Sequence, residues 1–404
     1  MKLAIVTPRY GREVGGGAET AARLLAEQLV ARRGWNIEVL TTTAIDAAWN
    51  DGFAPGSEEH GGVVVRRFAV ERRRARDFDE RSARLLPAPL RASAADERSW
   101  LEAQGPVSAG LIEAIATADA DAVALHPYLY HPTVIGAAVA RVPTVLHAAA
   151  HDELPLALAT YRELFARVDG LSFWSHAERR LVGERFAVGS TPQAVVGLGV
   201  DAGDGDPGAA RAAFGLGAAP YVLCLGRVDD GKGAALLARL WREYVARHDD
   251  ELHLVFAGPV VHRPDATPRM IVTGEVDDAT KWGLLRGAAT LVSPSAFESF
   301  GIVVMEAWSV GVPVLVNARC AVTVDHTREA AGGLVFGDFA GFEVAVERLT
   351  ATDGLGGQLG ARGRVHVARE YGWDAVVDRY ERLVTEVRHH AGERRLQATP
   401  PIGR

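Results

Sequence analysis

The chain has 404 residues, of which 48% are hydrophobic and 24% are charged, and its formal net charge is −7. Single hydrophobic cores stop growing near roughly 250–300 residues, so this length predicts two domains. The negative charge disfavours nonspecific binding to nucleic acid, and no apolar run approaches the roughly 18 residues that a membrane-spanning helix needs.

The first residues, "MKLAIVTPRY", predict a short buried strand, because they lack the apolar region and the small-residue cleavage site of a secretory signal. We therefore expect a cytoplasmic protein. The only two cysteines, Cys224 and Cys320, lie in strand-like apolar segments. They predict buried thiols rather than a disulfide framework, and neither indicates a metal site.

Strand-like and helix-like segments alternate along the first half of the chain, which predicts a parallel, doubly wound sheet. The expected strands are 2–8, 37–43, 122–127, 143–149 and 194–201. The expected helices are 17–32, one around 99–118 and one after Pro132.

A Gly/Ala/Asp/Pro-rich stretch at 201–220 predicts the seam between two α/β halves, with domains at 1–198 and 199–373. The second half repeats the alternation. Its expected strands are 221–226, 252–258, 270–274, 290–295, 313–317 and 332–336, and its expected helices are 234–247, 278–287 and 301–310. Ligands bind at the carboxyl ends of such strands, so two facing halves would form a site in the cleft between them.

The loop "TPRYGREVGGGAET" places Gly15, Gly16 and Gly17 directly before a helix. Glycines at this position let a polar or anionic ligand approach the backbone amides at the helix N-terminus, although a tight strand-to-helix turn needs them equally. A nicotinamide site is disfavoured, because the G-x-G-x-x-G spacing is absent and Glu38 falls at the beginning of the second strand rather than at its end.

Two motifs in the second half carry charged residues to strand ends. "LGRVDDGKG" supplies Arg227 and Lys232, which can converge on an anion, and it lacks the order of a Walker loop. "SAFESFGIVVMEAWSVGVPV" supplies Glu298 in a loop and Glu306 in the second turn of a helix beginning near Gly301. Alternatively, the cations and Glu298 are solvated, and Glu306 caps an amphipathic helix or forms a salt bridge on it.

The two carboxylates are separated by about 7.5 Å of helix at 1.5 Å per residue. A diphosphate over the helix N-terminus fits this gap, and each carboxylate can accept hydrogen bonds from hydroxyl groups on either side of it. The pattern therefore predicts a ligand with a hydroxyl-rich group at both ends of a diphosphate, as in a nucleotide sugar.

These motifs resemble those of retaining GT-B glycosyltransferases of family 4. "FESFGIVVMEAWSVGVPVLVN" is similar to the family's E-x7-E segment, "LGRVDDGKG" to its G-R-x-x-x-x-K-G segment and "GGGAE" to its first-loop glycines. "VVGLGVD" is similar to its N-G-V-D segment but departs from it at Gly197 and Leu198. The resemblance implies two Rossmann-like domains facing a cleft, a closing helix at about 374–392 that returns to the first domain, and a tail at 393–404.

The resemblance also implies roles for individual residues in the second domain. Glu298 would bind the hydroxyls of the donor sugar and Glu306 the ribose, while Arg227 and Lys232 would bind the diphosphate. The remaining donor-binding residues would act through backbone groups, with Val276 beside the base; they are Gly16, Gly17, Val276, Phe300, Gly301 and Ile302.

In the first domain, the family pattern places a histidine beside the transferred sugar. His151, followed by Asp152, matches that position better than His147, and either could instead be a core histidine. His126 and His131 would shape the acceptor side.

The function implied is transfer of a hexose-like sugar from a nucleoside diphosphate sugar to a hydroxyl acceptor with retention, by front-face attack and without a cofactor or metal. A sugar-nucleotide epimerase and a noncatalytic nucleotide-sugar-binding subunit are the alternatives. The composition suggests a bacterial source, where such enzymes build surface glycans or natural products. The base, sugar, acceptor and oligomeric state stay open.

Arginines are concentrated between Arg66 and Arg91. A solvated loop or helix face is the simpler interpretation of this segment. The alternative is a site for an anionic acceptor or for peripheral contact with a membrane surface.

Overall fold

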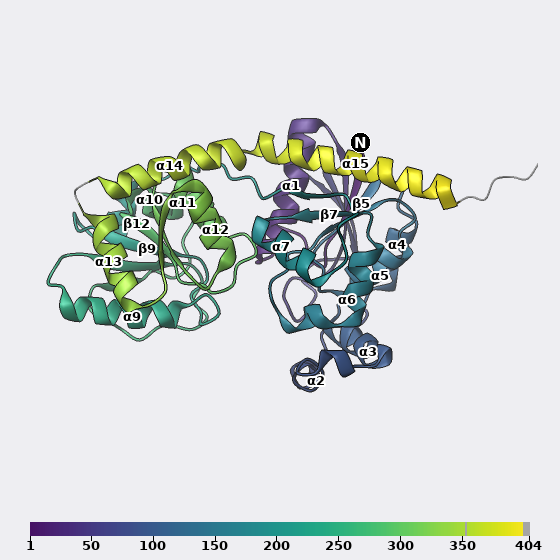
Figure 1. Ribbon diagram of the computed structural model, residues 1–404, viewed down its shortest axis with the longest axis horizontal. Helices are drawn as coiled ribbons and strands as arrows, with labels where there is room; N and C mark the ends of the chain where they lie inside the picture. The colour runs from purple at the N-terminus through teal and green to yellow at the C-terminus, as the bar shows by residue number, and fades with distance from the viewer. Residues whose placement is uncertain (352–353, 399–404) are drawn as a thin grey trace, which may run out of the picture. The chain divides into compact units, whose positions relative to one another are not determined.

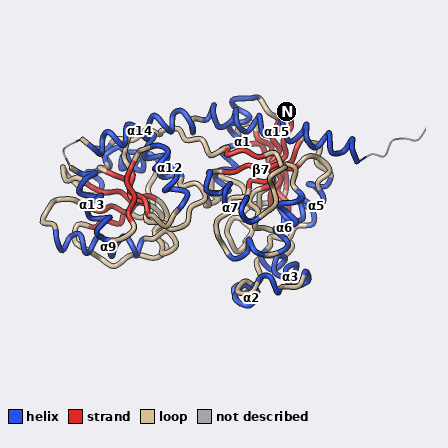
Figure 2. Tube along the Cα trace, viewed as in Figure 1, coloured by secondary structure: helices blue, strands red, loops and turns tan. Residues whose placement is uncertain are grey.

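The computed structural model describes residues 1–351 and 354–398, with side chains described as far as residue 393. It divides the chain into two compact units (Figures 1 and 2). Unit 1 comprises Met1–Gly197 and the segment from Val376 onward, and unit 2 comprises Leu198–Ala375. The expected boundary at 198/199 lies one residue from this division. Each unit contains one sheet with helices on both sides, as expected.

The sheet of unit 1 has eight strands in the order β3-β4-β2-β1-β5-β6-β7-β8, and only β3 runs antiparallel to its neighbour. The strands are β1 Lys2–Val6, β2 Asn36–Thr42, β3 Gly56–His60, β4 Val63–Phe68, β5 Ala122–Leu125, β6 Thr144–His147, β7 Gly170–Phe173 and β8 Gln193–Val195. The order reverses between β1 and β5, which is where doubly wound sheets bind ligands.

Seven helices and two short 3₁₀ segments of unit 1 precede its last strand. They are α1 Gly17–Arg33, α2 Phe78–Leu85, η1 Pro89–Arg91, α3 Ala94–Gln104, α4 Ala109–Ala116, α5 His131–Val139, η2 Leu154–Ala157, α6 Ala159–Arg167 and α7 His176–Arg185. The single helix expected around 99–118 was wrong. Gly105 has a φ of 66° and Pro106 has no amide hydrogen to donate, so the chain forms α3 and α4 instead.

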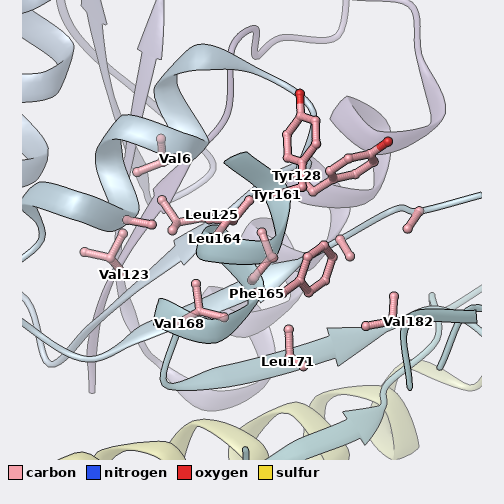
Figure 3. Packing of buried hydrophobic residues seen from close by; sticks show 14 of the residues in the cluster. Val6, Val123, Leu125, Tyr128, Tyr161, Leu164, Phe165, Val168, Leu171 and Val182 are labelled. Atoms are coloured by element: carbon pink, nitrogen blue, oxygen red, sulfur yellow. The ribbon is translucent and has the colours of Figure 1, made fainter. Parts of the chain in front are cut away.

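The core of unit 1 joins the central strands to α6 and α7 (Figure 3). Val6, Leu125 and Leu171 from the sheet are fully buried with Phe165 from α6. Tyr161 of α6 packs edge-on against Tyr128, with ring centroids 4.8 Å apart, and donates a hydrogen bond of 2.7 Å to the carbonyl of Leu129. This packing holds the loop that follows β5 against α6.

The arginine-rich segment is not a single solvated loop or helix face. Arg66 and Arg67 lie on β4, the inner strand of a hairpin that the sequence analysis did not predict. Arg67 is buried, pairs with Glu58 and donates to the carbonyl of Tyr10 at 2.8 Å. Two glycines with positive φ, at 61 and 62, connect β3 to β4 and are the signal that was missed.

The sheet of unit 2 has six strands that pair in parallel, in the order β11-β10-β9-β12-β13-β14. They are β9 Tyr221–Leu225, β10 His253–Ala257, β11 Met270–Val272, β12 Thr290–Ser293, β13 Val314–Asn317 and β14 Gly333–Phe336. The helices are α8 Pro207–Ala213, α9 Ala234–Arg247, α10 Asp278–Gly287, α11 Ile302–Ser309, α12 Ala321–Ala330, α13 Phe339–Thr350 and α14 Leu355–Glu370. Here the order reverses between β9 and β12.

The expected seam at 201–220 is more than a linker, because it contains helix α8. This helix packs on α10 so closely that a Cβ atom added to Gly205 would lie 2.3 Å from the amide nitrogen of Gly283. The glycines of the stretch therefore allow helix packing as well as turns. Cys320 likewise does not lie in a strand; it directly precedes α12 and is buried, whereas Cys224 of β9 is partly buried.

Helix α15, Trp373–Ala398, belongs to unit 1 from Val376 onward (Figure 1). Tyr380 is fully buried, and its hydroxyl lies 3.1 Å from Nε2 of His147. Arg379 donates to the carbonyl of Val196 at 2.9 Å. The helix extends beyond the expected end at 392, so part of the predicted tail is helical, and residues 399–404 lie outside the described residues.

We expect Tyr380→Ala to lower the free energy of unfolding of unit 1 by about 3–5 kcal/mol, because it removes a buried ring. Tyr380→Phe should cost only about 1 kcal/mol, the usual contribution of one hydrogen bond. Urea unfolding followed by tryptophan fluorescence measures both, since Trp35 lies 6.3 Å from the Tyr380 ring. Glu386→Ala, at an exposed position of the same helix, is the control. Equal losses in all three variants would contradict the prediction.

Candidate functional site

The clearest candidate site in unit 2 lies at the carboxyl ends of β9 and β12. These two strands are neighbours at the point where the strand order reverses. The loop after β9 carries Arg227 and Lys232, and the loop after β12 carries Glu298 and Phe300. The structure therefore brings together the two charged motifs found in the sequence.

The loop between β9 and α9 is shaped by Asp229. Its carboxylate accepts a hydrogen bond of 2.7 Å from the amide of Lys232 and pairs with the guanidinium of Arg227. Burial alone would raise the pKa of Asp229, but the bonds from Arg227 and Lys232 lower it overall. Gly233 closes the loop with a φ of 80°, and a Cβ atom added there would lie 2.6 Å from the carbonyl oxygen of Pro294. The two loops thus pack directly against each other.

An ion pair joins the same two loops. Nζ of Lys232 lies 2.7 Å from Oε1 of Glu298, and the side chains are 39% and 16% exposed. Each group satisfies the charge of the other. A ligand that binds both must supply negative charge to Lys232 and hydrogen-bond donors to Glu298.

Helix α11 presents its N-terminus beside this pair. Its first residue is Ile302, and Gly301 precedes it with a φ of 76° and without a side-chain cap. The amide of Val304 donates to the carbonyl of Gly301 at 2.9 Å, so an acceptor group at this helix end would bind the amides of Ile302 and Val303. The ring of Phe300 is buried against the rings of His326 and Tyr371, each with a centroid 5.4 Å away, so only its backbone can contact a ligand.

Glu306 forms a salt bridge, but with Lys281 of α10 rather than on its own helix, where the alternative interpretation placed it. Its Oε1 atom lies 3.1 Å from Nζ of Lys281, which also lies 3.3 Å from Asp278. Burial raises the pKa of Glu306 even though Lys281 opposes the shift. Burial would lower the pKa of Lys281, but Glu306 and Asp278 raise it overall.

Lys281 was missed by the sequence analysis, although a signal was present. The chain contains only three lysines, Lys2, Lys232 and Lys281, and otherwise uses arginine as its cation. Two of the three contact the two glutamates of one motif. Val276 is partly buried in the loop that leads to α10, the helix that carries Lys281.

In unit 1, the glycine loop has both a structural reason and an open helix end. Gly16 precedes α1 with a φ of 147° and no side-chain cap, and Gly15 to Gly17 are exposed. A Cβ atom added to Gly16 would lie 2.2 Å from Oε2 of Glu19. Glu19 is buried in an ion pair with Arg9. The glycine is therefore required by this pair, whether or not the amides bind a ligand.

The structure does not support a direct acceptor contact for His126. Its ring is 1% exposed and stacks on the ring of His147, with centroids 3.8 Å apart. Burial lowers the pKa of His126 to about 3 and also lowers that of His147. Tyr380 of α15 covers His147, and His147 in turn stacks on His126. His131, at the start of α5, is 8% exposed, and burial lowers its pKa.

His151 is partly exposed on the loop after β6, and a buried carboxylate from α7 holds that loop. Glu178 accepts hydrogen bonds from the amides of Ala150 at 2.9 Å and Trp174 at 2.7 Å. Ala149 adopts a φ of 53°, which an alanine rarely does, so the loop needs such support. The spacing of Ser175 and Glu178, a helix-start pattern, was the available signal.

Known proteins resemble parts of this chain in sequence. Residues 219–352, a third of the chain, match the family model "Glycosyl transferases group 1". A D-inositol 3-phosphate glycosyltransferase of Kribbella flavida is 32% identical over 205 residues, which are 45% of this chain and 47% of that protein. The chain spans about half the length of the curated relatives it matches.

Solved structures extend the similarity to both units at the level of fold. Sucrose-phosphate synthase from Thermosynechococcus elongatus has a TM-score of 0.70 and 19% identity, covering 96% of this chain and 98% of that one. The Anabaena protein HepE, solved with UDP and glucose, has a TM-score of 0.68 and 13% identity, covering 96% and 100%. The chain therefore has the GT-B fold, and the resemblance to GT-B glycosyltransferases is confirmed.

Among the residues that the structure describes, no group of three or more His, Cys, Asp or Glu side chains could hold a metal ion. Within the same residues, the helices are all too short or too polar to cross a bilayer.

Burial raises the pKa of Glu178 from its usual value near 4.5 to about 7, although backbone hydrogen bonds oppose the shift. Between these values the unfolded chain has lost the proton that the folded chain retains, so stability falls as pH rises through this window. At 1.36 kcal/mol per pKa unit the loss is roughly 3 kcal/mol.

We therefore expect the wild type to lose roughly 3 kcal/mol of unfolding free energy relative to Glu178→Gln when the pH rises from 4.5 to 7. Urea unfolding at several pH values measures it. Glu184→Gln, at an exposed position of the same helix, should show a difference that does not depend on pH. A constant difference for Glu178→Gln would contradict the prediction.

Proposed function

We propose that this protein is a retaining glycosyltransferase of family 4 that transfers a sugar from a nucleoside diphosphate sugar to a hydroxyl acceptor. The observation that carries the proposal is the Lys232–Glu298 ion pair, which joins the loops after β9 and β12 beside the uncapped start of α11. Cation, carboxylate and free amides at one strand-order reversal suit a donor that combines a diphosphate with hydroxyl groups. The UDP and glucose bound to HepE support the same choice of ligand.

In the proposed complex, the diphosphate replaces Glu298 as the partner of Lys232. The phosphate oxygens then accept hydrogen bonds from Lys232, from Arg227 and from the first amides of α11. Glu298, released from its partner, accepts hydrogen bonds from the sugar hydroxyls. This exchange avoids leaving either charged group unpaired, which would be costly at a partly buried site.

Glu306 and Lys281 act at the other end of the donor. Glu306 is only 13% exposed, so its charge depends on Lys281, which stays beside it at 3.1 Å. The second carboxylate oxygen of Glu306 accepts hydrogen bonds from the ribose hydroxyls, and the loop around Val276 borders the base. For unit 1 we keep the roles that the resemblance implies: Gly16 and Gly17 would bind through their amides, His151 would act toward the sugar and His131 on the acceptor side.

The reaction proceeds on one face of the sugar. The bond from the anomeric carbon to the leaving phosphate oxygen breaks, the acceptor oxygen forms the new bond on the same face, and its proton passes to the departing phosphate. Arg227, Lys232 and the helix N-terminus stabilise the charge that develops on the diphosphate, so no metal or cofactor is needed. We further propose that the enzyme is bacterial and works in the cytoplasm on a glycan or natural-product acceptor.

The donor base can be identified by thermal unfolding of the protein with UDP, GDP, ADP and TDP, with NAD as a comparison. One diphosphate at about 100 times its dissociation constant should add about 2.7 kcal/mol of stability. The corresponding nucleoside, which lacks phosphates, should stabilise far less at the same concentration. Stabilisation by NAD alone, or by no diphosphate, would overturn the donor assignment.

Using the sugar donor of that base, Lys232→Ala and Glu298→Ala should each lower kcat by on the order of 10²–10³, the usual cost of removing one transition-state contact. Product formation by chromatography measures turnover. Lys2→Ala is a matched control, because Lys2 forms a 2.6 Å ion pair with Asp119 within unit 1. Wild-type turnover in both site variants would exclude the proposed mechanism.

A further inference from the structure

A hollow on the surface of unit 1 has an apolar floor and an entirely cationic charged lining. It has a volume of about 720 Å³ and lies where η1, η2 and the end of α7 meet. Leu156 and Phe186 are buried in its floor, and Pro87 and Pro89 line its side. Its charged lining residues are Arg91, Arg162 and Arg185, and no carboxylate lines it.

Two leucines project beside this hollow into solvent. Leu90 on η1 is 79% exposed and Leu154 on η2 is 60% exposed, and the two short helices contact each other. No other leucine is an exposed large hydrophobic residue among those that the structure describes. Two such side chains on neighbouring elements form a patch rather than the isolated exposure that is normal on protein surfaces.

The arginines differ in how they are satisfied. Arg185 pairs with Asp152 at 2.6 Å. Arg91 and Arg162 are exposed, and no ion pair joins either to a carboxylate in the described part of the chain. Most arginines of the 66–91 segment are, by contrast, already paired: Arg66 with Glu38, Arg67 with Glu58, Arg72 with Glu102, Arg73 with Asp51 and Arg81 with Asp77.

We propose that this leucine–arginine surface, formed by Leu90, Leu154, Arg91, Arg162 and Arg185 around the hollow, docks on a membrane that contains anionic phospholipid. The leucines enter the boundary between headgroups and acyl chains, and the arginines bind lipid phosphates. A bilayer explains all five residues together. A small anionic ligand inside the hollow would leave Leu154 in water, since that side chain does not line the hollow.

Of the 66–91 segment, for which a membrane contact was expected, only the last residues belong to this leucine–arginine surface. The other residues of the surface lie on η2, α6 and α7. The membrane proposal does not depend on the proposed glycosyl transfer. If the protein binds vesicles but transfers no sugar, only the membrane proposal holds. If it transfers sugar but does not bind vesicles, only the glycosyltransferase proposal holds.

The test is sedimentation of the full chain with vesicles of phosphatidylcholine alone and with 30% phosphatidylglycerol, about one lipid in three being anionic. We expect binding to the anionic vesicles that weakens at least tenfold for Leu90→Ser/Leu154→Ser and for Arg91→Glu/Arg162→Glu. Raising the salt concentration to about 0.5 M should weaken the wild type but add little to the loss in the arginine variant.

Matched controls lie on unit 2, where Val344 and Val365 are 55% and 65% exposed and Arg362 and Arg364 are exposed on α14. Val344→Ser/Val365→Ser and Arg362→Glu/Arg364→Glu should bind vesicles like the wild type. All variants change exposed side chains, so equal melting temperatures establish that they fold. Binding that is absent in the wild type, or equally lost in the controls, overturns the proposal. Binding of monomeric dodecyl phosphate without vesicle binding also overturns it, in favour of a small amphiphile.

Discussion

The contact between the loops after β9 and β12 is the constraint on which the rest of unit 2 depends. Gly233 lets the first loop approach the carbonyl of Pro294, and the Lys232–Glu298 pair joins the two loops above that contact. Asn317 of β13 donates to the same Pro294 carbonyl at 2.8 Å, which ties the next strand to it. Three neighbouring strand ends are therefore held in one arrangement before any ligand arrives, and binding need not pay for ordering them.

Unit 1 achieves the same result with neutral and buried groups. The loop after β6 is held by hydrogen bonds that backbone amides donate to the carboxylate of Glu178. The end of strand β6 is covered by α15 through the contact between His147 and Tyr380. His126 and His147, at these strand ends, are therefore part of the interior, whereas His151, further along the loop after β6, is partly exposed. The burial that removes His126 from contact with solvent also keeps its ring neutral.

Much of this arrangement could be predicted because its signals are local. Buried parallel strands are continuous apolar runs, and glycines mark the loops that follow them, so the strand ends carrying Arg227, Lys232 and Glu298 could be found in advance. The rest depends on tertiary contacts. Pro106 divided an apparently continuous helix, and the partner of Glu306 lies 25 residues earlier in the chain. His147, on which His126 stacks, is covered by Tyr380, which lies 233 residues later.

The scarcity of lysine has a practical consequence for labelling. Reagents that acylate primary amines can modify only the chain's first amino group and three side chains, and two of those belong to the candidate site. Fluorescent tagging or surface coupling through amines would therefore block the very loops under study, whereas the pattern of acylation at Lys232 and Lys281, read by mass spectrometry, would act as a footprint of whatever occupies them.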